Sequence, residues 1–368
     1  MRCTCLVLNN SANALFNKGA EAAMSAFYHS GYVFEEIRVL PQADCEAVVK
    51  TISELKNKSE LVAVLCAEAK LSIVRERIIA AISGLEEKGA FCGATIFEDA
   101  DSAICLLAMD KMATGAEYVK EVCIPFLGKK FAFRSDKIII RSMGASEARV
   151  DALLLESKRL SAGTATYRHT RRYDEDVIEI IYDGNTPKMA IDDTMRLLLD
   201  GLGDTVYALE DVSLETQLVT LLKVRGKKIS VAESFTGGGL ARRIVSVSGA
   251  SEVYFEGVNT YDERSKIKRL GVSDFTLGSK GAVSDQTAYE MALGLLNTGD
   301  CDIAVATTGL AGPKSDRHGN PVGLCFIAVG TKEKITVYRY KFDGEREEIT
   351  EKGINYALYH AYKHLKNI

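Results

Sequence analysis

The sequence has 368 residues, of which 47% are hydrophobic and 26% charged, and its formal net charge is −4. This length exceeds that of a usual single domain and the composition is that of a globular chain, so we expect two or three domains. The charge balance gives no global reason to bind nucleic acid, and no apolar run approaches the roughly 20 residues of a membrane span. Because the first residues also lack the apolar stretch of a signal peptide, we expect a cytoplasmic protein.

Nine cysteines are distributed along the chain without a C-x-x-C pair, a pattern typical of reduced thiols in a core rather than of disulfides or zinc ligands. His360 and His364 lie one helical turn apart, which suits a metal pair. A solvated terminal helix is the simpler interpretation of that spacing. We therefore expect no metal site and no cofactor.

Residues 1–130 alternate short apolar runs with segments of helical spacing. The predicted strands are Arg2–Leu8, Tyr32–Leu40 and Leu61–Cys66, and the predicted helices are Ala12–Ser30, Cys45–Leu55 and Leu71–Leu85. This βαβαβα order predicts a parallel sheet with helices on both faces.

Residues 131–208 have a different pattern, typical of a small α+β unit. The predicted elements are a strand at Phe131–Arg141, a helix at Ser146–Arg159, a hairpin of Ala165–Arg171 with Asp176–Tyr182, and a helix at Lys188–Leu199. Two basic pairs, at 158–159 and 171–172, are a candidate nucleic-acid surface. So short a basic cluster is usually a solvated face, so we expect no nucleic-acid binding.

The α/β pattern returns in residues 209–368. The predicted helices are Leu214–Val224, Gly238–Val247, Asp285–Asn297 and Glu345–Leu365, and the predicted strands are Lys228–Ala232, Asp302–Thr307, Val322–Val329 and Ile335–Phe342. Ligands of open α/β sheets bind at the carboxyl ends of strands, so the segments that follow these strands are the places to search for a site.

The segment V-A-E-S-F-T-G-G-G-L-A-R-R-I (231–244) joins a strand to a helix through three glycines. Ser234 and Thr236 are suited to capping the helix, but a cap does not need three residues that each cost up to ~1 kcal/mol relative to alanine inside a helix. A ligand that approaches the backbone closely would require glycines in this turn. The N-terminus of a helix also suits an anion or an oxyanion. Packing of the turn is the alternative explanation.

A second glycine-containing turn, T-T-G-L-A-G-P (307–313), follows the strand Asp302–Thr307. Both turns are expected at the same edge of the sheet, where they would form two sides of one site.

If Ser234 is a nucleophile, it needs a base, and no Ser–His–Asp order is present in this part of the chain. The segment N-T-Y-D-E-R-S-K (259–266) offers Tyr261 and Lys266. A lysine can act as a base at neutral pH only if its pKa falls by about 3 units from ~10.4. A charged lysine can instead lower the pKa of the tyrosine, which would then take the serine proton. The sequence leaves both relays open.

These segments resemble the CinA family from Leu214 to about Leu365. The shared motifs are A-E-S-F-T-G-G (232–238), S-G-A-S (248–251), T-Y…K (260–266), L-G-V (270–272), G-A-V-S (281–284), T-G-L-A-G-P (308–313), P-V-G (321–323) and F-D-G-E-R (342–346). The resemblance implies a C-terminal α/β amidase domain. Its implied reaction is hydrolysis of nicotinamide mononucleotide to nicotinate mononucleotide and ammonia, without a metal, in pyridine nucleotide salvage.

The resemblance also implies roles for individual residues. Ser234 would be the nucleophile, and Tyr261 with Lys266 would form the proton relay. The implied substrate-binding residues are Glu233, Thr236, Gly237, Gly238, Thr308, Gly309, Ala311, Gly312 and Arg346, the last for the nucleotide phosphate. The sequence departs from the family at Phe235, where cysteine is usual, after Tyr261, and in the Lys-Ser-Asp-Arg-His loop beyond Pro313. These departures concern the fit of the substrate.

The rest of the chain is similar to the other domains of full-length family members. R-S-M-G-A-S-E (141–147) and G-D-T-V-Y-A-L-E-D (203–211) resemble a KH-type domain. Residues 1–130 resemble the family's doubly wound molybdopterin-binding-like domain, but L-N-N-S-A-N-A-L (8–15) and V-L-C-A-E-A-K-L-S (64–72) stand where that domain has glycines and paired acids. We therefore predict three domains, 1–130, 131–208 and 209–368, the first a scaffold without its site.

Two other functions are alternatives to the amidase. The family's association with competence and DNA damage suggests a non-catalytic interaction protein, and its N-terminal domain suggests a metal-dependent ADP-ribose pyrophosphatase. The missing acids argue against the pyrophosphatase, and retention of Ser234, Tyr261 and Lys266 favours the amidase. The expected partners are a small nucleotide substrate and a second copy of the chain in a homodimer.

Overall fold

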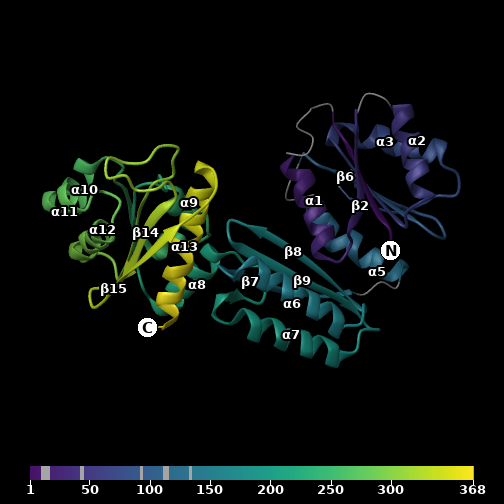
Figure 1. Cartoon of the computed structure of the whole chain (residues 1–368). Coiled ribbons are helices and arrows are strands. Elements are labelled where there is room, and N and C mark those ends of the chain that lie inside the picture. Colours follow the sequence, from purple (N-terminus) through teal and green to yellow (C-terminus); the bar gives the residue numbers. More distant parts are fainter. Residues whose placement is uncertain (10–16, 42–44, 92–93, 111–115, 132–134, 368) are drawn as a thin grey trace. The chain divides into compact units, whose positions relative to one another are not determined.

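The computed structural model describes residues 1–9, 17–41, 45–91, 94–110, 116–131 and 135–367, which form three β-sheets with flanking helices (Figure 1). The predicted α/β class is confirmed. The chain packs into two compact units, Met1–Lys137 with Ile181–Asn185, and Ile138–Ile180 with Thr186–Ile368. The expected division at 130/131 lies near the end of the first stretch. The division at 208/209 lies within the second unit, so the three-domain arrangement stays a prediction.

The first sheet has the strand order β2-β1-β3-β6-β5-β4. Its strands are β1 (Cys3–Leu8), β2 (Phe34–Leu40), β3 (Leu61–Cys66), β4 (Glu86–Phe91), β5 (Ala94–Glu98) and β6 (Ala103–Ala108). Its helices are α1 (Lys18–His29), α2 (Cys45–Lys56), α3 (Glu68–Ala81), the π-helical turn η2 (Val119–Cys123) and α5 (Ile124–Lys130). Strands β2, β1, β3 and β6 are parallel, β5 runs antiparallel to β6, and β4, antiparallel to β5, runs in the direction of the other strands. The prediction of a parallel sheet is therefore confirmed for the three predicted strands, β1, β2 and β3, and wrong for β5, which runs against the others.

Strand β1 shows why this sheet is covered on both faces. Its six residues are all buried, and successive side chains point to opposite sides. Cys5 and Val7 pack in a cluster with Phe27 of α1, whereas Leu6 packs in a second cluster with Ile52 of α2. A strand buried on both faces has a continuous apolar sequence, which is the pattern that predicted it.

Helix α1 begins later than the sequence pattern suggested. The predicted helix started at residue 12, but the observed one starts at Lys18, where the Asn17 side chain accepts hydrogen bonds from the N–H groups of Gly19 and Ala20. An asparagine in this position satisfies donors that the first helical turn leaves free. Residues 10–16, which include most of the 8–15 segment, lie outside the described part of the chain.

The second sheet has the order β10-β7-β9-β8. Its elements are β7 (Ser135–Met143), α6 (Glu147–Leu160), β8 (Ala165–Arg172), β9 (Glu175–Asp183), α7 (Lys188–Leu202), the short 3₁₀ helix η3 (Gly203–Thr205) and β10 (Val206–Ala208). The predicted hairpin and both helices are confirmed as elements. Residues 132–134 of the predicted strand lie outside the described residues.

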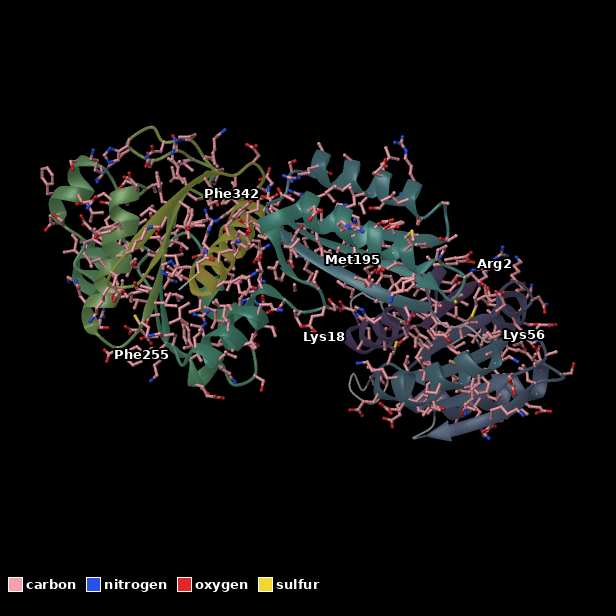
Figure 2. The ribbon with its side chains drawn as sticks, turned by 90° about the horizontal axis from the view of Figure 1, so that it is seen from below. Arg2, Lys18, Lys56, Met195, Phe255 and Phe342 are labelled. Carbon is pink, nitrogen blue, oxygen red and sulfur yellow. The ribbon has the colours of Figure 1, made fainter. Side chains whose placement is uncertain are left out.

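The third sheet, order β12-β11-β13-β14-β15, carries the candidate site. Its strands are β11 (Ile229–Glu233), β12 (Tyr254–Asn259), β13 (Ile303–Gly309), β14 (Leu324–Gly330) and β15 (Ile335–Lys341). Its helices are α8 (Leu214–Arg225), α9 (Gly239–Val245), the 3₁₀ turn η4 (Ala250–Glu252), α10 (Glu263–Leu270), α11 (Asp274–Ser279), α12 (Asp285–Thr298) and α13 (Arg346–Asn367). Strand β11 pairs in parallel with β12 and β13, and β14 is antiparallel to β13. Figure 2 labels Phe255 on edge strand β12 and Phe342 after β15, the other edge strand.

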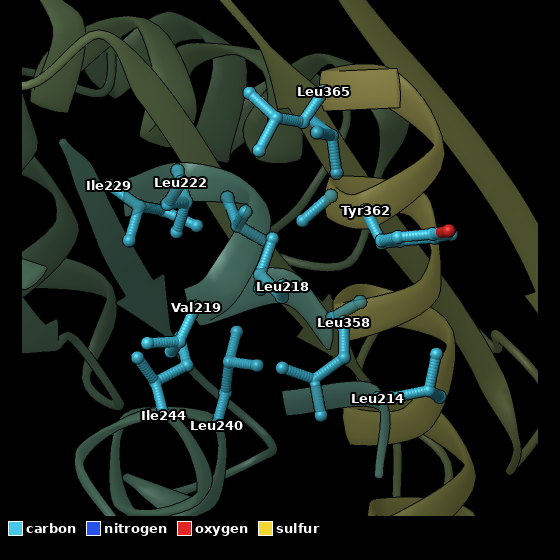
Figure 3. Packing of buried hydrophobic residues seen from close by; sticks show 14 of the residues in the cluster. Leu214, Leu218, Val219, Leu222, Ile229, Leu240, Ile244, Leu358, Tyr362 and Leu365 are labelled. Atoms are coloured by element: carbon cyan, nitrogen blue, oxygen red, sulfur yellow. The ribbon is translucent and has the colours of Figure 1, made fainter. Parts of the chain in front are cut away.

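Helices cover both faces of the third sheet, α12 on one and α8 with α13 on the other (Figure 1). Leucines recur every four residues in α8 and therefore line one helical face. There Leu218 packs with Leu358 and Leu365 of α13 and with Ile229 of β11 (Figure 3). Helix α13 is thus a core helix rather than the predicted solvated one, and His360 is only 8% exposed.

Candidate active site

Ser234 lies directly after β11, at the carboxyl end of the parallel pair β11 and β13. All five residues of β11 are buried, and the Ser234 N–H donates to the Thr307 carbonyl oxygen at 3.0 Å, which ties the turn to β13. The Ser234 side chain is only 8% exposed, yet it lines a cavity. A hydroxyl held by two strand ends in this way is positioned by the sheet rather than by a loop.

Lys266 reaches the same hydroxyl from helix α10. Asp262 caps this helix by accepting from the Arg264 N–H, which places Lys266 one turn into it. The Lys266 side chain is 1% exposed, and its Nζ donates to Ser234 Oγ at 2.9 Å and to the Thr260 carbonyl oxygen. The two groups are 32 residues apart in sequence, and folding brings them into direct contact.

Burial lowers the pKa of Lys266 from 10.5 to about 8, against the opposite effect of the Glu263 and Asp262 carboxylates. The physical cause is the loss of hydration that an ammonium suffers in a protein interior. Lys266 is therefore still mostly charged at pH 7, and about half of it is a neutral amine near pH 8. In that form the hydrogen bond reverses, and the Ser234 hydroxyl donates to the nitrogen lone pair.

Tyr261 and Arg346 form the exposed side of the site. The Tyr261 side chain is 63% exposed, and its hydroxyl accepts a hydrogen bond from Arg346 Nη2 at 3.0 Å. Arg346 Nη1 donates to the Gly312 carbonyl oxygen at 2.6 Å. Among the described residues no carboxylate forms an ion pair with Arg346, so its charge is available to an anion. Tyr261 thus contacts Arg346, whereas Lys266 contacts Ser234.

A cavity of about 320 Å³ connects these groups. Eight of the twelve residues expected from the sequence line it, namely Ser234, Tyr261, Lys266, Thr308, Gly309, Ala311, Gly312 and Arg346. The hydroxyl of Thr308 donates to the Ala282 carbonyl oxygen at 2.6 Å, which orients this side chain in the wall. The volume lies within the range of small-molecule sites.

Four expected residues, Glu233, Thr236, Gly237 and Gly238, do not line the cavity. The Glu233 carboxylate, 1% exposed, instead accepts from the N–H groups of Gly238, Leu240 and Ala241 at 2.8–3.0 Å. The start of α9 is therefore capped by the protein's own carboxylate, and the sequence-based interpretation of this helix N-terminus as a free anion site is wrong. The Thr236 hydroxyl is also engaged, at 2.7 Å from that of Thr307.

The three glycines serve the turn and its packing. Gly237 and Gly238 adopt φ angles of +61° and +94°, which residues other than glycine rarely adopt. Gly239 has a different constraint, because a Cβ at this position would lie 2.5 Å from Ile354 of α13. The packing alternative, left open by the sequence, therefore accounts for all three.

We expect Glu233→Gln to reduce stability and leave substrate affinity nearly unchanged. The amide keeps one acceptor oxygen but loses the charge that three N–H groups share, at a cost of about 1–2 kcal/mol. Urea denaturation of this variant and of Glu256→Gln, on edge strand β12, measures the difference. A large rise in KM with unchanged stability would contradict the capping role.

Several lining residues could not be assigned from the sequence. Phe235 replaces the family's usual cysteine. Helix α13 accommodates this larger side chain because residue 353 is glycine, where a Cβ would lie 2.4 Å from the Phe235 ring. Lys314 and Arg317 come from the loop that departs from the family, and Arg317 pairs with Glu263 at 3.1 Å. The unusual loop composition was the only available signal for them.

Two further observations bear on the class of site. In the part of the chain that the structure describes, no group of three or more histidine, cysteine, aspartate or glutamate side chains could hold a metal ion. Within the same residues, none of the helices combines the length and apolarity needed to cross a membrane.

Comparison with known proteins identifies the part of the chain that carries the cavity. Residues 211–365 match the family described as the CinA C-terminal domain. A "Putative competence-damage inducible protein" of Caldicellulosiruptor saccharolyticus is 36% identical over 65% of this chain and 59% of its own length. A "CinA-like protein" of Kosmotoga olearia is 41% identical over 44% of this chain and 40% of its own length. The chain thus spans 59% and 40% of the length of these two relatives, less than two thirds in each case.

A solved structure of a CinA superfamily protein from Klebsiella pneumoniae is 31% identical, with a TM-score of 0.41. The similarity covers 42% of this chain and 97% of that one.

Proposed function

Because residues 211–365 belong to the CinA C-terminal domain family, we propose that this part of the chain is a serine amidase acting on nicotinamide mononucleotide. The observation that carries the proposal is the 2.9 Å contact between Lys266 Nζ and Ser234 Oγ inside a cavity. A buried amine beside a hydroxyl is a base–nucleophile pair, and the lowered lysine pKa suits proton transfer near neutral pH.

The first half of the reaction forms an ester. Neutral Lys266 takes the Ser234 proton while Oγ attacks the carboxamide carbon. The resulting tetrahedral oxyanion collapses, the carbon–nitrogen bond breaks, and the Lys266 ammonium gives its proton to the leaving group, which departs as ammonia. The pyridine carbonyl is left esterified to Ser234.

The second half regenerates the enzyme. Lys266 takes a proton from water, the hydroxide adds to the ester carbon, and Ser234 Oγ leaves and recovers the proton. The products are the pyridine carboxylate nucleotide and ammonia, and one water is consumed. The buried Lys266 contacts the Ser234 hydroxyl, whereas the exposed Tyr261 contacts Arg346, and this contrast favours the relay through Lys266.

The cavity also supports a nucleotide substrate. Arg346 at its rim offers two N–H donors and an unpaired charge, which suits a phosphate. Phe235, Val283 and Ala311 supply apolar lining for the pyridine ring. A mononucleotide matches a site with an apolar interior and a cationic rim.

The test is ammonia release by the purified full chain from nicotinamide mononucleotide. We expect Ser234→Ala to abolish release and Ser279→Ala, which removes an exposed serine hydroxyl on α11, to retain it. Equal release by wild type and Ser234→Ala would overturn the catalytic assignment. Absence of ammonia release by the folded wild type would overturn the assignment of nicotinamide mononucleotide as the substrate.

A further inference from the structure

A second cavity lies at the opposite end of the third sheet, where strands β11 and β13 begin. It has a volume of about 770 Å³ and is lined by residues around the end of α8, the segment before β13, the β14–β15 turn and the end of α13. Strand β13 begins here with Ile303 and ends with Thr308 and Gly309 in the candidate active site. The two cavities are therefore separated by the length of this strand, and they share no lining residue.

This second cavity carries an excess of positive charge. Its charged lining residues are Arg225, Lys227, Lys332, Lys334, Asp302 and Glu333. Asp302 pairs with Lys227 at 3.0 Å, and Glu333 accepts from the Thr331 hydroxyl. Within the described residues, the ion pairs leave the other three cations without a carboxylate partner. Cations gathered in a concave site raise the local concentration of anions.

His364 contributes an imidazole ring to the wall of this cavity. Its Nε2 is shielded from solvent and has no hydrogen-bond partner among the described residues, although the side chain lines the cavity. Burial, together with the positive charge of Lys334, lowers the pKa of His364 and favours the neutral ring. The ring is therefore a local reporter of ligand binding in the cavity.

The interior of the cavity is apolar. Ile303 and Leu365 are fully buried core residues that line it, and Cys301 is 7% exposed. Small-molecule sites combine such an apolar surface with a few polar groups, and this volume lies within their usual range.

We propose that this cavity is a second ligand site, which binds a small organic phosphate of nucleoside monophosphate size. Arg225, Lys332 and Lys334 hold the phosphate, and the rest of the ligand occupies the cavity beside Cys301 and His364. The site is independent of the amidase chemistry, because none of its residues touches the first cavity.

Nuclear magnetic resonance of the histidine rings of the full chain tests this proposal. The probes are adenosine monophosphate, adenosine and inorganic phosphate, and a His364→Gln variant assigns the His364 signal. We expect adenosine monophosphate to shift that signal saturably, with inorganic phosphate weaker and adenosine weakest. The Lys332→Gln/Lys334→Gln variant should raise the apparent Kd at least about tenfold, because two charge-assisted contacts are lost.

A matched control distinguishes binding at this site from nonspecific electrostatic attraction of the ligand. Lys158→Gln/Lys188→Gln removes the same charge from exposed positions on α6 and α7 and should leave the Kd unchanged. Arg346→Gln should also leave it unchanged, which distinguishes this site from nucleotide binding in the first cavity. The proposal is overturned if millimolar adenosine monophosphate does not move the His364 signal, if adenosine binds as tightly, or if the control weakens binding equally.

Discussion

Lys266→Met is expected to lower kcat for ammonia release about 10³-fold while making the protein more resistant to unfolding. The loss follows because no other described side chain donates to or accepts from Ser234 Oγ, so the nucleophile loses its base. Lys268→Met, on the same helix but exposed, is the matched control and should change neither property. A Lys266→Met variant that retains activity would contradict the assignment of the base.

The gain in stability comes from removing a buried ammonium. A fall in pKa from 10.5 to about 8 corresponds to roughly 3 kcal/mol of desolvation cost, and two lost hydrogen bonds offset about 1 kcal/mol each. The net gain is about 1 kcal/mol at pH 7, where lysine is charged in both the folded and unfolded states. Between pH 8 and 10.5 only the unfolded state keeps the proton, so wild type becomes more stable and the advantage of methionine fades. Urea denaturation at pH 7 and pH 10 measures both.

Arg346→Gln is expected to raise KM for nicotinamide mononucleotide roughly 10- to 100-fold and leave kcat within a few-fold. The loss equals one or two charge-assisted hydrogen bonds to phosphate, about 1.5–3 kcal/mol in total. Nicotinamide riboside, which lacks the phosphate, provides the matched substrate, and its KM should not change. Arg269→Gln, an exposed arginine on α10, is the control variant.

An equal rise in KM for both substrates would contradict phosphate binding by Arg346. It would indicate that the variant disturbs the wall of the cavity through the lost contact with Gly312.

In the first and third sheets, buried strands β3 and β13 could be predicted from the sequence, whereas edge strands β4 and β12 could not. Strand β3 and the first four residues of β13, IAVA, are apolar because both faces are covered, so composition alone indicates these strands. Strand β4, with the sequence EEKGAF, and β12, with YFEGVN, have charged residues or glycine inside. Each is a strand because it pairs with a neighbour, β5 or β11 respectively, and that pairing is not readable locally.

The candidate site shows the same limit. The motifs placed Ser234, Tyr261 and Lys266 together but left the base open, because the choice depends on burial. Lys266 is 1% exposed and Tyr261 is 63% exposed, a contrast that three-dimensional packing creates. Glu233 was assigned to substrate because it stands in the same motif, whereas its carboxylate caps the helix that the motif begins.

The pH dependence of kcat/KM for ammonia release from nicotinamide mononucleotide tests the serine–lysine pair most directly. The free enzyme must hold Lys266 as a neutral amine, so kcat/KM should rise with pH through an apparent pKa of about 8 and then level off. A profile that stays flat from pH 6 to 10, or that falls as the amine deprotonates, would contradict the account.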